Sequence, residues 1–344
     1  MILRQFRRVA WLALAAYLAA PHGFAEAQGA QPAPTELKLS VAVGPAFALG
    51  RAAQGWAKAI NEAGIEALTA TPYPGATLAQ RDPAREFAAL RDGATDLALG
   101  SSLFWSAQVN ALAVVGLPWL APEPAELAAL ADGDVRVLIF RAIEEAGAVP
   151  LALAPIGHRA LATTTRSVRT PGDVAGLAIR VASTPYLIEF YAGLRGQPHA
   201  VPFAEADAAF RSGALNAQEG MAAAFAASRI DALGFKYVTL WDAVGEIAVF
   251  AASRVAWSRL TPAQQALLRE SARAAAEDLA RSAAADEQIA IGQLRSRGVA
   301  IFRLTPSGRA AFAAAARPVY DRWAVVAGEA LVRVAESAVS AAPR

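Results

Sequence analysis

The side chains that most often carry out catalysis are scarce in this chain. It contains no cysteine, which excludes thiol nucleophiles, cysteine metal sites and disulfide bonds. Beyond the N-terminal leader the only histidines are His158 and His199. The sequence has no nucleophile elbow, no HExxH zinc motif, no phosphate-binding loop and no dinucleotide fingerprint. We therefore predict that the protein is not an enzyme and that it uses no metal and no cofactor.

The remaining candidates for acid–base chemistry are weak. His158 precedes Arg159 and could touch a site, although a structural role is the simpler interpretation. We place His199 in an exposed connection. The carboxylate pairs at 144–145 and 277–278 lie on helical faces that we expect to be solvated. A secreted hydrolase or lyase that acts on a small organic acid therefore stays the alternative hypothesis, with His158 as its one plausible base.

Binding a small molecule makes lighter demands, since an apolar pocket with a few fixed polar groups is enough. Arg180 lies next to the end of the apolar segment 176–181, which reads as an interior strand. Because an unpaired buried guanidinium is very costly, Arg180 must meet an internal carboxylate, face a cleft or bind an anion. Its planar fork suits a carboxylate, which accepts two parallel hydrogen bonds from it. Arg159 offers a weaker version of the same argument.

The elements that must position these arginines alternate in type along the chain. Apolar patterns and turn signals predict strands at 36–43, 65–70, 96–100, 151–154, 160–164 and 178–181. They predict helices at 51–63, 82–91, 185–193 and 204–212. This alternation of strands and helices favours an α/β fold with mainly parallel strands. A mature chain of about 310 residues has room for two domains.

A long helix follows in the last third of the chain. Thr261 is its expected N-cap, Pro262 its first residue and Gln264 the partner of the cap. From there to Arg297 only Gly292 interrupts the helical pattern. Such a helix would be on the order of 50 Å long at 1.5 Å per residue. Because that exceeds the diameter of one domain, we predict that it spans two.

The N-terminus has the three parts of a secretory signal. A basic start with Arg4, Arg7 and Arg8 precedes the apolar run 9–20, and Ala25-Glu26-Ala27 forms a small-x-small cleavage site. We predict cleavage after Ala27, a linker at 28–35 and a periplasmic mature protein. A retained signal anchor is the alternative, and the choice between the general and twin-arginine export routes stays open.

Removal of this leader changes the charge balance. The whole chain carries 32 Lys and Arg against 30 Asp and Glu, whereas the part beyond residue 27 carries 29 of each. A net charge near zero without clustered basic residues argues against nucleic acid or an anionic membrane as partner.

Five blocks of the sequence resemble a known family. The blocks are 74–78, 93–96, 116–120, 158–181 and 202–219. In this order they resemble the solute-binding proteins of tripartite ATP-independent periplasmic (TRAP) transporters, of the dicarboxylate-binding (DctP-like) type. The resemblance extends from about Leu37 to Trp323, nearly the whole mature chain.

The resemblance implies a two-lobed periplasmic-binding-protein fold with a cleft between the lobes and a long domain-spanning helix. It places lobe I at 36–156 plus 245–285 and lobe II at 157–244 plus 286–335. A monomer of this kind closes over its ligand by a hinge motion. It captures a small organic acid and delivers it to the permease subunits in the membrane for uptake.

The resemblance also assigns the ligand site. Arg180 would anchor the ligand carboxylate, Arg159 would be a second contact, and Phe203 an apolar wall. The chain at Gln218 to Gly220 would form another wall. The other lobe and the hinge would contribute four further residues, Ser101, Ser102, Trp105 and Trp241. For each aromatic candidate (Trp105, Trp119, Phe203, Phe225 and Trp241), core packing is the alternative.

Two departures from the family pattern bear on the ligand. Asn216-Ala217 stands where the family usually has Asp-Gly, and Gly220 stands where it often has an asparagine. Losing that amide removes a hydrogen bond and leaves room beside the anchor. Our hypothesis is a monocarboxylate with an apolar or aromatic body, such as a 2-oxo or 2-hydroxy acid.

Overall fold

The computed structural model describes residues 35–64, 68–202 and 205–343. The predicted signal peptide, most of the linker and the candidate wall Phe203 lie outside these residues, so the predictions about them stay predictions. No helix in the described part of the chain is both long and apolar enough to cross a membrane.

The first sheet has five strands in the order β2-β1-β3-β10-β4. They are β1 (Thr35–Val41), β2 (Leu68–Tyr73), β3 (Leu97–Ser101), β4 (Ala148–His158) and β10 (Gly245–Ser253). Strand β1 pairs in parallel with β2 and β3. Strand β10 is antiparallel to both of its neighbours, β3 and β4.

The second sheet has six strands in the order β11-β9-β5-β8-β6-β7. They are β5 (Ala160–Thr163), β6 (Ala178–Val181), β7 (Gln197–Ala200), β8 (Ala217–Gly220), β9 (Tyr237–Leu240) and β11 (Ala300–Arg303). Strand β5 is antiparallel to β8 and β9, whereas β6 is parallel to β7 and β8. His199 lies exposed in β7, an edge strand where we expected a connection.

Two chain segments cross from one sheet to the other. Strand β4 continues into β5 with Arg159 as the one residue between them, and β9 leads back into β10. The returning segment runs antiparallel to the outgoing one in both sheets. The prediction of mainly parallel strands was therefore wrong at the centre of the fold, because a chain that crosses and returns pairs antiparallel. The predicted lobe boundaries stay a prediction, since residues 34–344 form a single unit.

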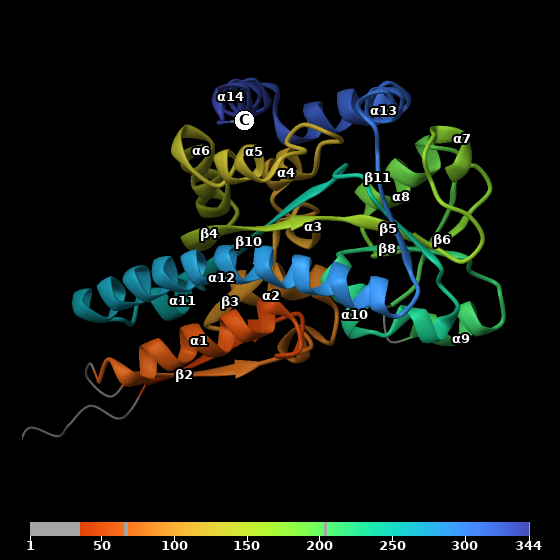
Figure 1. Cartoon of the computed structure of the whole chain (residues 1–344). Helices are drawn as coiled ribbons and strands as arrows, with labels where there is room; N and C mark the ends of the chain where they lie inside the picture. The colour runs from red at the N-terminus through yellow and green to blue at the C-terminus, as the bar shows by residue number, and fades with distance from the viewer. Residues whose placement is uncertain (1–34, 65–67, 203–204, 344) are drawn as a thin grey trace, which may run out of the picture. The chain divides into compact units, whose positions relative to one another are not determined.

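The predicted long helix is present as α12 (Pro262–Ser296), and it extends past both sheets (Figure 1). Thr261 and Gln264 form the expected capping box at its start. Leu268 and Leu279 pack into the core of the first sheet together with α1 (Ala48–Glu62). Further along, Leu294 packs into the core of the second sheet.

Shorter helices cover the remaining faces. In chain order these are α2 (Glu86–Arg91), α3 (Ser102–Trp105), α4 (Ala113–Gly116), α5 (Pro124–Ala129), α6 (Gly133–Glu145), α7 (Pro171–Val174), α8 (Pro185–Gly193), α9 (Ala206–Arg211), α10 (Ala222–Ala227) and α11 (Arg254–Trp257). The C-terminal helices α13 (Pro306–Ala327) and α14 (Glu329–Ala341) pack over α4, α5, α6 and α8 (Figure 1). Helix α13 contacts both α4 and α8 and so ties together residues far apart in the sequence.

Candidate functional site

Arg159 lies where the chain crosses between the sheets, and its guanidinium is held by one carboxylate from each sheet. Its Nε donates to Glu219 Oε2 on β8 at 2.5 Å. Its NH1 donates to Glu246 Oε2 on β10 at 2.6 Å. The three side chains are almost inaccessible, with Arg159 9% exposed, Glu246 4% and Glu219 0%. Both ion pairs are therefore shielded from water.

Arg180 ends the same network. It lies on β6, next to β8, and is 7% exposed. Its Nε donates to the carbonyl of Val201 at 2.9 Å, which fixes the orientation of the guanidinium. Its NH1 lies 3.9 Å from Glu219 Oε1, the oxygen that also accepts the amide N–H of Ala182 at 2.8 Å. Glu219 is thus shared between the two arginines.

The network also reaches β3 in the first sheet. The hydroxyl of Ser101, at the end of β3, donates to Glu246 Oε1. Five side chains are therefore connected in the sequence Ser101, Glu246, Arg159, Glu219 and Arg180. They join β3 and β10 of one sheet to β8 and β6 of the other.

The charges of this network balance, with two arginines and two glutamates. Burial by itself lowers the pKa of Arg159, but Glu219 and Glu246 outweigh burial and the net shift is upward. Burial tends to raise the pKa of Glu219, but the two arginines and the Ala182 amide reverse this and hold it below its usual range. For Arg180 the effect of burial is larger than that of Glu219, and the pKa of Arg180 therefore falls below its ordinary value. The pKa values of the two guanidinium groups are therefore shifted in opposite directions.

Trp241 fixes the backbone at the crossing. Its indole Nε1 donates to the carbonyl of Arg159 at 3.1 Å, and the Arg159 amide donates to Val244 at 2.9 Å. Trp119 holds the returning segment, because its indole Nε1 donates to the carbonyl of Trp241 at 2.9 Å. The rings of Trp119 and Trp241 meet edge to face. Trp241 is thus a core residue that positions the arginine.

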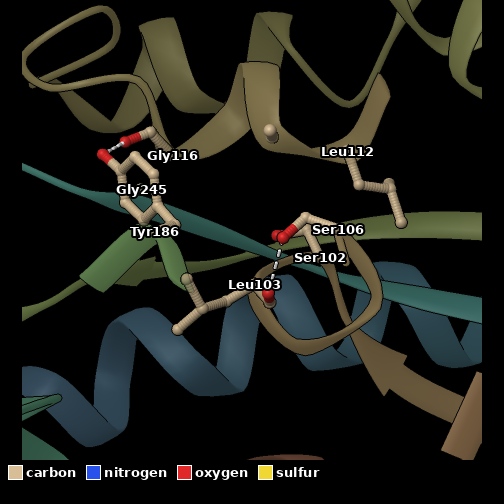
Figure 2. Close-up of a pocket in the computed structure, with 8 residues that line it drawn as sticks. Ser102, Leu103, Ser106, Leu112, Gly116, Tyr186 and Gly245 are labelled. Atoms are coloured by element: carbon tan, nitrogen blue, oxygen red, sulfur yellow. Dashed lines mark hydrogen bonds between the residues drawn. The ribbon is translucent and has the colours of Figure 1, made fainter. Parts of the chain in front are cut away.

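Ser102 lies beside the network, on the wall of a small pocket (Figure 2). Its hydroxyl accepts the amide N–H of Ile247 at 3.1 Å. Across the pocket the hydroxyl of Tyr186 donates to the carbonyl of Gly116, as Figure 2 shows. None of the residues that line this pocket carries a charge. It therefore has no group to compensate a carboxylate, unlike the adjacent network.

The other predicted wall residues have distinct surroundings. Trp105 is fully buried and packs against Phe87. Gln218 is buried on β8 and pairs in register with Arg180. A Cβ placed on Gly220 would come within 3.0 Å of the ring of Phe225. The place that we expected the missing side chain to leave open is thus occupied by an aromatic ring.

His158 does not take part in the network. Its Nε2 lies 2.7 Å from the carbonyl oxygen of Ala121, and this nitrogen therefore donates to a backbone acceptor. In the described part of the chain, no three His, Asp or Glu side chains gather in a group that could hold a metal ion.

Two members of the network, Glu219 and Glu246, were not predicted as site residues from the sequence. Glu219 appeared only within a resembling block, and Glu246 was not singled out. Glu246 is the one charged residue in the run 245–252, so the argument that selected Arg180 applies to it as well.

Comparison with known families gives a match over most of the chain. Residues 39–325 match the bacterial extracellular solute-binding protein family 7 (DctP). Among curated proteins, an uncharacterised protein of Sinorhizobium fredii is 28% identical over 232 residues. The alignment covers 67% of this chain but only 42% of that longer protein.

Solved structures give a match of similar extent. A TRAP periplasmic solute-binding protein from Ralstonia eutropha with bound (S)-2-acetolactate is 34% identical, with a TM-score of 0.85. The match covers 89% of this chain and 98% of that one. A TRAP solute-binding protein from Bordetella bronchispeptica, with density assigned to pantoate, is 24% identical with a TM-score of 0.78 and shows the shared fold. That match covers 88% of this chain and 98% of the other. The family model and the Ralstonia structure are both of solute-binding proteins, and they give the hydrolase alternative no support.

Proposed function

Because the chain belongs to the bacterial extracellular solute-binding proteins of family 7 (DctP), we propose that it is the periplasmic receptor of a TRAP transporter and binds a small 2-hydroxy monocarboxylate at Arg180. In this role the protein captures the acid outside the cell membrane and delivers it to the permease subunits. We place it in the periplasm as a monomer, exported by the signal at its N-terminus.

The observation that carries the proposal is the placement of Arg180. The side chain is 7% exposed, and the carbonyl of Val201 holds its Nε. A guanidinium stays charged at any ordinary pH, so its burial calls for an anion. The internal anion Glu219 lies 3.9 Å from the NH1 of Arg180 and is shared with Arg159, which it contacts at 2.5 Å.

Two further observations support the ligand class. The Ralstonia relative holds (S)-2-acetolactate, which is a branched 2-hydroxy acid with a single carboxylate. In this chain the ring of Phe225 fills the space next to Gly220, and it supplies an apolar surface where the family pattern often has an amide. A compact acid with methyl groups suits such surroundings better than a polyhydroxylated sugar acid.

A thermal-shift screen of small organic acids tests this proposal. Ligand at 100 times its Kd stabilises a protein by about 2.7 kcal/mol, so hits are easy to detect. We expect 2-hydroxy monocarboxylates among the hits and no stabilisation in Arg180→Gln. Arg211→Gln changes an exposed arginine on α9 and is the matched control, which should behave as the wild type. Unchanged affinity in Arg180→Gln, or stabilisation by neutral sugars or amines alone, would overturn the proposal.

A further inference from the structure

We propose that Glu246 is a specificity-determining residue that limits the ligand to a single carboxylate. The inference rests on the proposed function, since it concerns the charge of the acid that binds at Arg180. It explains why a site with two buried arginines should prefer a monoanion to a dianion.

The first step is that Arg159 is occupied by the protein itself. Its Nε and NH1 contact Glu219 at 2.5 Å and Glu246 at 2.6 Å. Of these two carboxylates, Glu219 is also near Arg180, at 3.9 Å, whereas Glu246 belongs to the other sheet. Glu246 is therefore the carboxylate that holds the NH1 of Arg159 toward the first sheet, and together with Glu219 it compensates the charge of Arg159.

The second step is the charge count of the buried network. Two guanidinium groups face two carboxylates, and all four side chains are less than 10% exposed. A monocarboxylate brings the total to one negative charge, held at the guanidinium of Arg180. A dicarboxylate brings a second negative charge next to groups that are already neutralised, where burial without a partner is costly. The network therefore disfavours the dianion.

The third step is that Glu246 can be neutralised without loss of its shape. Its Oε1 accepts from the Ser101 hydroxyl and its Oε2 from Arg159. Glutamine keeps one carbonyl oxygen for these donors and has nearly the same volume, so Glu246→Gln removes the charge and leaves the packing. The buried network then has a net charge of +1, which a second ligand carboxylate can use.

The experiment compares two acids that differ mainly in one carboxylate. The probes are 2-hydroxy-2-methylbutanoate and 2-hydroxy-2-methylbutanedioate, and the measurement is the Kd of each by isothermal titration calorimetry. We expect the wild type to bind the monoacid more tightly. In Glu246→Gln the ratio of the two Kd values should shift toward the diacid by about tenfold or more, as expected for one unit charge at close range within a protein. The control is Glu86→Gln, which changes another buried carboxyl group of the first-sheet region, one that bonds to Ser40 and not to the arginines. Its ratio should stay at the wild-type value.

The outcomes separate the two proposals. If the wild type binds the diacid as tightly as the monoacid, the inference about Glu246 is wrong while the proposed function stands. The same holds if Glu246→Gln folds, binds and keeps the wild-type ratio. If the wild type binds neither acid, the proposed function fails and the inference fails with it. Chemical denaturation of each variant identifies any that has not folded, and in that case Glu246→Met, which also removes the charge and keeps most of the volume, supplies the comparison.

Discussion

Replacement of Arg159 by methionine tests whether the buried network is organised as described. Methionine fills much of the volume of the arginine stem but leaves Glu219 and Glu246 without their common partner. Removing one member of a buried ion pair typically costs about 3–5 kcal/mol, because the other charge stays buried without compensation. Since Arg159 pairs with two buried carboxylates, we expect a loss in the upper part of that range.

The structure predicts which of the two carboxylates destabilises the protein more once Arg159 has been removed. Without Arg159, Glu219 still accepts the Ala182 amide at 2.8 Å and still faces Arg180 at 3.9 Å. Glu246 keeps the hydroxyl of Ser101, which carries no charge. A second substitution, Glu246→Gln, should therefore recover more stability in the Arg159→Met background than Glu219→Gln does.

The assay is urea denaturation of the ligand-free protein at pH 7.5, for the wild type, the single variant and the two double variants. We expect the Glu246→Gln double variant to recover about 1–3 kcal/mol, the usual cost of a buried polar group without a partner. A cost below about 1 kcal/mol for Arg159→Met would mean that the ion pairs contribute little. If Glu219→Gln recovers as much stability as Glu246→Gln or more, the inference that Glu246 depends more strongly on Arg159 than Glu219 does is wrong.

Two further predictions concern buried positions outside the charge network. Burial raises the pKa of Glu86 from 4.5 to about 7, so its contribution to stability is present below pH 4.5 and is lost as pH rises through 7. Denaturation between pH 5 and 8 should show a loss of about 3 kcal/mol in the wild type that Glu86→Gln lacks, and parallel profiles would contradict this. Gly220→Ala should cost about 1–2 kcal/mol, because the new methyl group lies 3.0 Å from the Phe225 ring. The double variant with Phe225→Leu should recover most of that loss in the same denaturation assay, and a full loss in the double variant would argue against this contact.

Parts of the fold could be predicted because local signals define them. Strand β6 at 178–181 and helix α8 at 185–193 have the predicted bounds, since a turn precedes the strand and Pro185 begins the helix. The long helix was predictable from its capping box and its uninterrupted pattern. Strand β10 gave no such signal, because it is buried on both faces and its sequence has no alternation.

The site was predictable only in part, for a related reason. Arg180 stands out as a charge in an apolar segment, and this follows from the sequence alone. The partners of Arg159 are 60 and 87 residues away, on strands whose neighbours depend on the antiparallel return of the chain. Whether a buried arginine is already neutralised by the protein or has charge to offer a ligand is therefore a property of the tertiary structure.

A crystal structure of the protein with 2-hydroxy-2-methylbutanoate is the most direct test of the central claim, that Arg180 binds the ligand carboxylate. We predict that the carboxylate accepts hydrogen bonds from the guanidinium of Arg180, while Arg159 keeps its contacts with Glu219 and Glu246. A carboxylate bound to Arg159 after that arginine has left Glu246, or bound at a site remote from both arginines, would contradict the account.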